Sequence, residues 1–465
     1  MMRTSLTSWA LVIALFGCSS VEVAAGGGDE GGAGGAIGSG GATSIGGDGG
    51  AGPATACSSD WAVEFGPVDT FANRHSLAVT SDCATYVVGR FGGALTLGET
   101  TLDSAGPVSW FLFKLDSTGQ PLWSKSLGED GFYGNPVLAA TPEGGVALSG
   151  TLRGAVDFGD GSVSSADDSP FLAVYGPDGE LAFERVFDAT ATYVEVRSVA
   201  VAPDGEVLVA GALSGALILD DTELEAPSEG RGLIGRFAAD GALRWAKLVD
   251  VSYLLPVVVD DEGDAFIGSP ERIAKLDRDG NTLWQRPFIG DAGYVNDLAI
   301  GFNGEIAVAG AFSGAVDLGF GLVGSGAPNG DAEGYVLVLD ASDGAPRFAR
   351  TWVDPDTWNA IVATALRPNG DVLVFGEDRA FWHAEFLEEL APTGETLTHQ
   401  TFTVLCSSPT VCDTSATGMR LDGSGNVLIS GEFWGTLYFG GEPYESGDED
   451  HMFVAGLSKI TQDPE

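Results

Sequence analysis

Short apolar runs separated by turn-forming residues recur along the chain from Trp61 onward. A representative unit has an apolar run at 198–202, the turn Pro203-Asp204-Gly205-Glu206, and a second apolar run at 207–211 that ends in glycine. Alternation with a period of two is typical of β-strands, and Asp-Gly and Asn-Gly pairs favour tight hairpin turns. The pattern therefore predicts an all-β chain built from hairpins.

Two landmarks recur in step and indicate an internal repeat. The glycine that ends the second strand occurs seven times, at Gly89, Gly150, Gly211, Gly268, Gly310, Gly376 and Gly431. A later hairpin glycine is usually followed four residues on by an aromatic, as in Gly119/Trp123, Gly179/Phe183, Gly241/Trp245, Gly280/Trp284 and Gly344/Phe348. The sixth copy departs from this rule, with Gly394 followed by Thr398. Residues 381–390 mix charged and apolar side chains at helical spacing, but their position in the sixth copy predicts a third strand.

Four short strands per copy without helical crossovers predict a seven-bladed β-propeller. The seventh copy has its third strand at 452–457 and no aromatic fourth strand after it. Residues 61–66 resemble the fourth strand at 123–128. We therefore expect the N-terminal strand to complete the last blade and close the ring, because closure removes exposed sheet edges. An open solenoid would leave this complementarity unexplained.

Composition restricts the partners of this fold. The chain has 465 residues with 66 acidic and 22 basic side chains, a net charge of −44. Such a charge repels phosphate backbones and excludes nucleic acid as a partner. An apolar content of 44% is enough for a large core. We expect a monomer.

The first residues predict export. Arg3 precedes an apolar run at 9–17, which is too short to span a bilayer and suits a signal peptide of residues 1–17. The run ends in Leu15-Phe16-Gly17-Cys18, which resembles a bacterial lipobox. The resemblance implies lipid attachment at Cys18, and Ser19 after it points to the outer membrane of a Gram-negative bacterium, on its periplasmic or its surface side. The alternative is an ordinary signal peptide with an incidental cysteine.

Residues 18–56 predict a flexible tether. Glycine accounts for 15 of the 27 residues in 26–52, a composition that cannot bury a core. A coil of 39 residues has a root-mean-square span of about 34 Å. The propeller then occupies residues 57–465.

The remaining four cysteines suit two disulfides in an oxidising compartment. Cys406 and Cys412 are close enough in sequence for a local clip, which leaves Cys57 and Cys83 for each other. Three pairings are formally open, and spacing favours this one.

Loop lengths select a candidate binding face. The turns after strands one and three are uniformly tight, whereas the links on the opposite face are long and variable. An aromatic precedes the inner strand on that second face in five copies, namely Tyr133, Tyr193, Tyr253, Tyr294 and Trp358. Function concentrates on long loops held by a rigid scaffold, so these residues form the candidate binding face. The alternative is that they are structural plugs between blades.

Catalytic and metal motifs are scarce. The histidines His75, His383, His399 and His451 stand in no metal-binding spacing, and there is no GxSxG elbow or P-loop. Acidic loops are suited to Ca²⁺, but no calcium-loop motif supports it, and we expect neither metal nor cofactor. A non-enzymatic protein is the favoured interpretation, with an enzyme as the alternative.

Hairpins such as Lys114-Leu115-Asp116-Ser117-Thr118-Gly119-Gln120-Pro121-Leu122-Trp123 resemble the repeats of quinoprotein-like and other bacterial repeat β-propellers. Quinoprotein dehydrogenases of this fold carry adjacent cysteines, which this chain lacks, so the resemblance implies a fold and not quinone chemistry. The favoured function is a membrane-anchored binding and scaffolding lipoprotein that presents its loop face to a protein or glycan of the cell envelope. The alternatives are an outer-membrane assembly scaffold, as in a propeller lipoprotein of similar plan, and a glycan-acting enzyme with its active site over the propeller axis.

Overall fold

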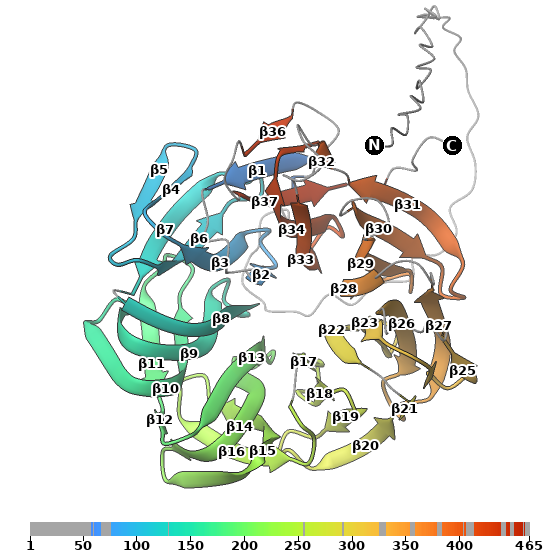
Figure 1. Cartoon of the computed structure of the whole chain (residues 1–465), viewed down its shortest axis with the longest axis horizontal. Coiled ribbons are helices and arrows are strands. Elements are labelled where there is room, and N and C mark those ends of the chain that lie inside the picture. The colour runs from blue at the N-terminus through green and yellow to red at the C-terminus, as the bar shows by residue number, and fades with distance from the viewer. Residues whose placement is uncertain are drawn as a thin grey trace, which may run out of the picture. The chain divides into compact units, whose positions relative to one another are not determined.

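The computed structural model describes residues 57–58, 60–66, 76–128, 130–253, 256–290, 293–324, 332–353, 359–378, 384–402, 404–405, 413–438, 443–446, 451–458 and 460. Every regular element in these ranges is a β-strand, as the sequence predicts. Seven antiparallel sheets are arranged in a ring, each with its first strand towards the centre (Figure 1). The protein is therefore a seven-bladed β-propeller.

The first four blades follow chain order from the inner to the outer strand. Blade 1 consists of β2 (Ser76–Val79), β3 (Thr85–Phe91), β6 (Ser109–Leu115) and β7 (Pro121–Leu127). Blade 2 consists of β8 (Asp130–Ala140), β9 (Val146–Asp157), β10 (Ser162–Tyr175) and β11 (Leu181–Val186). Blade 3 consists of β13 (Tyr193–Val201), β14 (Val207–Leu219), β15 (Thr222–Phe237) and β16 (Leu243–Val249). Blade 4 consists of β17 (Val257–Val259), β18 (Ala265–Gly268), β19 (Arg272–Leu276) and β20 (Thr282–Pro287), and its strands are short.

The last three blades keep the same order. Blade 5 consists of β22 (Tyr294–Ile300), β23 (Glu305–Phe312), β26 (Glu333–Asp340) and β27 (Pro346–Trp352). Blade 6 consists of β28 (Asn359–Leu366), β29 (Val372–Asp378), β30 (Ala384–Leu390) and β31 (Thr396–Phe402). Its third strand lies where the segment with helical spacing was predicted to be extended. Blade 7 consists of β33 (Asp413–Leu421), β34 (Val427–Trp434), β37 (His451–Leu457) and β1 (Trp61–Phe65).

The predicted ring closure is confirmed. Strand β1 pairs antiparallel with β37, with Trp61 opposite Gly456 and Phe65 opposite Met452. One buried apolar cluster lies between each pair of neighbouring blades, and the cluster between blades 7 and 1 contains Phe65 together with Phe111. The N-terminal strand thus supplies both the missing hydrogen bonds and part of the last interface.

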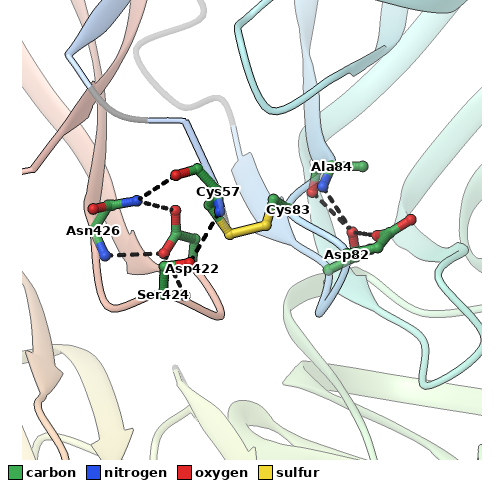
Figure 2. Close-up of a disulfide and its surroundings, with 8 residues drawn as sticks. Cys57, Asp82, Cys83, Ala84, Asp422, Ser424 and Asn426 are labelled. Atoms are coloured by element: carbon green, nitrogen blue, oxygen red, sulfur yellow. Dashed lines mark hydrogen bonds between the residues drawn. A yellow bond between two sulfur atoms is a disulfide. The ribbon is translucent and has the colours of Figure 1, made fainter. Parts of the chain in front are cut away.

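A disulfide fixes the start of this closing strand. Cys57 and Cys83 are joined with their Cα atoms 5.4 Å apart, as the cysteine spacing predicts. The Cys57 N–H donates to Ser424 Oγ at 3.0 Å in the first turn of blade 7, while Cys83 lies in the first turn of blade 1 (Figure 2). The chain therefore enters the ring between the first turns of two blades. The second predicted pair, Cys406 and Cys412, lies outside the described residues.

One face of the ring carries additional hairpins, and we call it the crown face; the opposite face, with the turns after strands one and three, is the turn face. The hairpins are β4 (Ala94–Leu97) with β5 (Thr100–Asp103), the extended ends of β9 with β10 and of β14 with β15, β24 (Val316–Asp317) with β25 (Leu322–Val323), and β35 (Thr436–Leu437) with β36 (Tyr444–Glu445). They belong to blades 1, 2, 3, 5 and 7. In the described ranges, blades 4 and 6 contribute no such hairpin.

Each crown hairpin also pairs with the link that arrives from the preceding blade. The short strands β12 (Asp188–Ala189), β21 (Ile289–Gly290) and β32 (Val404–Leu405) pair with β14, β24 and β35. Asp130 pairs with Ala155 and Gly66 with Thr96 in the same way. The long links therefore form a second tier of sheet that holds neighbouring blades together on the crown face.

The two sequence landmarks have distinct packing roles. The second-strand glycines lie opposite a large apolar residue of the third strand, in the pairs Gly89/Phe111, Gly150/Phe171, Gly211/Leu233, Gly310/Tyr335, Gly376/Phe386 and Gly431/Phe453. In blade 4 the predicted landmark is displaced by one residue: Gly268 lies opposite Ile273, and Ser269 takes the glycine position, next to Arg272. The prediction that Gly268 is the second-strand glycine of blade 4 is therefore wrong. The strand register, and not the residue type, defines that position, and Ser269 occupies it.

The outer-strand aromatics join each blade to the next one. Each ring lies against the hairpin glycine of the following blade, in the pairs Trp61/Gly119, Trp123/Gly179, Phe183/Gly241, Trp245/Gly280, Trp284/Gly344 and Phe348/Gly394. A Cβ at these glycines would lie 2.5–3.1 Å from the ring, and their φ angles are between +73° and +86°. The exception at Thr398 follows directly. An aromatic ring at position 398 would pack on a hairpin glycine of blade 7. Blade 7 has no such hairpin, because its fourth strand is β1.

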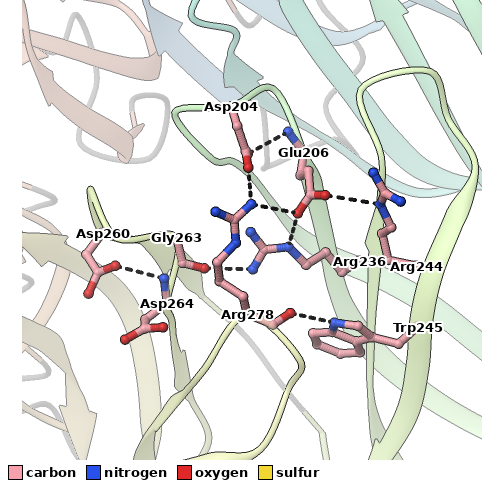
Figure 3. Close-up of polar contacts among 9 residues, drawn as sticks. All are labelled: Asp204, Glu206, Arg236, Arg244, Trp245, Asp260, Gly263, Asp264 and Arg278. Atoms are coloured by element: carbon pink, nitrogen blue, oxygen red, sulfur yellow. Dashed lines mark hydrogen bonds and ion pairs between the residues drawn. The ribbon is translucent and has the colours of Figure 1, made fainter.

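Polar contacts on the turn face cross the same interfaces. Arg236 is 1% exposed and donates from Nε to Glu206 at 2.6 Å and from Nη1 to the Gly263 carbonyl of blade 4 at 2.7 Å (Figure 3). The Trp245 indole donates to the Arg278 carbonyl at 2.8 Å, also in blade 4 (Figure 3). Arg367 bridges blades 6 and 7 in the same way, to the Gly425 carbonyl at 2.6 Å. Polar contacts on the turn face therefore join neighbouring blades.

Two glycine substitutions separate backbone strain from this packing. Gly304→Ala, at φ +71° with nothing within 4 Å of the new methyl group, should lower the unfolding free energy by about 1 kcal/mol. Gly241→Ala, at φ +83°, places its methyl group 2.7 Å from Phe183 and should cost about 1–3 kcal/mol more. Denaturant unfolding measures both variants, and equal losses would contradict the proposed role of the ring–glycine contact.

Candidate functional site

The crown face brings together part of the predicted aromatic set. Tyr193 and Tyr294 are the first residues of the inner strands β13 and β22, and Tyr253 lies in the link between blades 3 and 4. Tyr193 is 44% exposed and Tyr294 is 57% exposed. Tyr133 lies in β8 opposite Thr151, and its side chain is outside the described part, as is Trp358. Three of the five predicted residues thus lie on one sector of the ring, around blade 4.

An arginine that the sequence analysis did not single out organises this sector. Arg197 donates from Nε to Glu195 at 2.8 Å and from Nη2 to the Tyr193 hydroxyl at 3.0 Å. Its guanidinium carbon lies 4.7 Å from the centre of the Tyr253 ring, within the range of a cation–π contact. The Tyr193 hydroxyl also donates to Glu195. The four side chains form a connected group, which we call the Arg197 cluster.

The backbone places Arg197 in this position. The register of β13 against β14 shifts between Val196 and Ser198, so Arg197 is the additional residue of a β-bulge. Gly211 faces the bulge, and a Cβ there would lie 2.0 Å from the Glu195 carbonyl oxygen. The glycine landmark of the repeat therefore permits the bulge that projects Arg197 out of the regular ladder. The sequence alone does not indicate this role for Arg197, because the bulge is seen only in the pairing register of β13 and β14.

Tyrosine ionisation reflects the packing of the cluster. Burial raises the pKa of the Tyr193 phenol, and its hydrogen bond to Glu195 raises it further. Burial also raises the pKa of Tyr253, and neighbouring Tyr294 adds to this shift. Both phenols are therefore neutral at physiological pH, and the Tyr193 hydroxyl acts as a hydrogen-bonding group.

An ion pair between inner strands supports the ring below the crown. Asp297 of β22 accepts from Arg420 of β33 at 3.2 Å and from the Thr364 N–H of β28 at 3.1 Å. Burial raises the pKa of Asp297, and the Arg420 charge opposes the shift. This contact joins blades 5, 6 and 7 and is structural.

The Arg197 cluster presents aromatic rings and polar groups that can bind a partner. Glu195 is occupied by Tyr193 and Arg197, so it is not poised as a general base. Across the residues that the structure describes, no group of three or more His, Cys, Asp or Glu side chains is arranged to hold a metal ion. Within the same ranges, no helix is long and apolar enough to cross a membrane. His451 contacts Glu64 between β37 and β1, while His75 and His383 lie outside the described residues.

The known proteins that this chain resembles are solved structures of similar fold. No family model and no curated protein matches the chain. The WD40 domain of Neurospora crassa Pan2 is similar, with a TM-score of 0.46 and 8% identity over 86% of this chain and 98% of that one. The WD40 repeats of RRP9 give 0.47 and 9% over 84% and 97%, and a chain of the mitotic checkpoint complex gives 0.47 and 9% over 90% and 98%. At TM-scores below 0.5 these likenesses say nothing about partners, and the propeller is defined by its own seven blades.

Proposed function

We propose that this protein is a membrane-anchored binding and scaffolding lipoprotein that presents its crown face to a protein or glycan of the cell envelope. The observation that carries the proposal is the Arg197 cluster together with Tyr294, a group of half-exposed aromatic rings on a rigid crown. Aromatic rings with one apolar face and one polar edge are the side chains that most often anchor protein interfaces and stack on sugars.

The point where the chain enters the ring supports an orientation in which the crown face points away from the tether. Cys57 lies between the first turns of blades 7 and 1, on the turn face. A tether anchored through Cys18 would therefore join the propeller at the face opposite the crown. Such an arrangement leaves the crown free to meet a partner, whether the lipid is in the periplasmic or the surface leaflet of the outer membrane.

Of the two alternatives, the assembly scaffold uses the same face, and the enzyme has its active site over the propeller axis. An outer-membrane assembly scaffold would bind protein segments on the crown face, which is a special case of the proposed role. A glycan-acting enzyme would require convergent acid and base groups, and the acid of the described cluster is already engaged by Arg197 and Tyr193. Binding is therefore the function that the geometry favours.

Lipid attachment is tested by labelling cells with radioactive palmitate. The wild-type chain should incorporate the label, and Cys18→Ala should lose it completely while keeping a folded propeller, because the thiol is the only lipid acceptor proposed. Equal labelling of both proteins would contradict the anchor and leave the crown-face proposal standing.

Crown-face binding is tested with immobilised full-length protein and an envelope fraction. The double variant Tyr253→Ala/Tyr294→Ala should retain at least about fivefold less of the specifically bound protein or glycan, since anchor residues dominate interface energies. Its unfolding free energy should fall by no more than about 1 kcal/mol, the value of a half-exposed cation–π contact.

Phe302→Ala is the matched control, because Phe302 is an aromatic residue of the turn face and is 75% exposed. It should retain as much as the wild type. If the double variant retains as much as the wild type, the crown-face site is wrong. If the double variant loses stability steeply, the tyrosines are structural plugs between blades, and the crown-face site is wrong as well.

A further inference from the structure

A cavity of about 230 Å³ opens between blades 3 and 4. One wall is the outer strand β16 with the residues after it, and the other is the face of β18, β19 and β20. Its lining includes Lys247, Val249, Ser269, Arg272, Ala274 and Leu276. The cavity therefore combines an apolar floor with two basic side chains.

The cavity exists because blade 4 departs from the packing rule of the other blades. At the position opposite the second-strand glycine, six blades carry a large apolar side chain, whereas blade 4 carries Arg272 beside Ser269. Phe171 shows what the usual residue does, since its ring packs 5.4 Å from the ring of Trp110 in the preceding blade. The buried cluster between blades 3 and 4 is also the only one of the described clusters without a buried aromatic ring.

The Arg272 guanidinium is held in place by neutral acceptors. It donates from Nη1 to Gln285 Oε1 at 2.9 Å and from Nη2 to the Asp250 carbonyl at 2.6 Å. These two bonds fix the plane of the group and leave three of its five N–H donors for other partners. The Asp250 carboxylate pairs elsewhere, with Arg231 at 3.2 Å.

Lys247 provides a second positive charge in the same cavity. Its ammonium group lies 5.1 Å from the centre of the Trp245 ring, and burial lowers the pKa of Lys247. Within the described residues, the Arg272 guanidinium has neutral partners and no carboxylate within 4 Å, whereas the charge of Asp277 acts on Lys247 and opposes the lowering of its pKa. In a chain with 66 acidic and 22 basic residues, an arginine without a carboxylate partner in a cavity requires an explanation.

We propose that the cavity between blades 3 and 4 binds a small organic carboxylate whose apolar body lies on Ala274, Ile267 and Leu276. The carboxylate would accept charge-assisted hydrogen bonds from Arg272, whose planar donors match its geometry. Lys247 would add a second positive charge at the other end of β19. A free inorganic anion fits less well, because the floor of the cavity is apolar.

The test is calorimetric titration of the full-length protein with acetate, butyrate, hexanoate and benzoate, and with hexanol as the uncharged probe. Hexanoate or benzoate should bind saturably and more tightly than acetate, and hexanol should bind at least about tenfold more weakly than hexanoate. Arg272→Gln should weaken carboxylate binding at least about tenfold, since hydrogen bonds to charged groups contribute about 1.5–3 kcal/mol.

The double variant Ser269→Gly/Arg272→Phe restores the pattern of the other six blades and fills the cavity. It should abolish binding while keeping or raising the melting temperature, so it serves even if Arg272→Gln folds poorly. Arg153→Gln is the matched charge control, because Arg153 is 47% exposed on blade 2. The proposal is overturned if no carboxylate of the panel binds, if Arg153→Gln weakens binding as much as Arg272→Gln, or if the filled variant binds like the wild type.

Discussion

The pairing of β1 with β37 is the constraint on which the rest of the structure depends. Every other blade is a single chain segment, but blade 7 takes its outer strand from the opposite end of the sequence. That strand brings Phe65 into the last inter-blade core and Trp61 onto the hairpin glycine of blade 1. The series of ring–glycine contacts therefore begins with Trp61 and ends with Phe348. The absence of an aromatic at Thr398 is a consequence of the closure and not an irregular copy.

The sequence predicts those parts of the fold that repeat with a fixed offset. Hairpin glycines with an aromatic four residues later indicated the outer strands, and the resemblance of residues 61–66 to 123–128 indicated the closing strand. The second tier of the crown was not predicted, because two-residue strands such as β12 and β21 are too short to produce a hydrophobic period. The register error at Gly268 has a related cause, since a neighbouring glycine in a short strand hides a shift of one residue.

The candidate sites were harder to predict than the fold. Tyr193, Tyr253 and Tyr294 were found because they precede the inner strands, but Arg197 depends on a bulge that only the strand register reveals. Arg272, in contrast, has a signal in the sequence itself. It occurs eight residues before the hairpin glycine Gly280, where Phe111, Phe171, Leu233 and Phe386 occur eight residues before theirs. Both sites adjoin blade 4, whose strands are short.

Hydrogen exchange of the backbone amides tests ring closure most directly. Strand β7 is the outer strand of blade 1 and is the matched reference for β1, the outer strand of blade 7. If the ring is closed by β1, the hydrogen-bonded amides of Trp61–Phe65 should exchange as slowly as those of Pro121–Leu127, to within about tenfold. The amides of His451–Leu457 should also be protected, both those that face β34 and those that face β1. Exchange of Trp61–Phe65 at the rate of an unstructured peptide, with β7 still protected, would contradict the closed propeller.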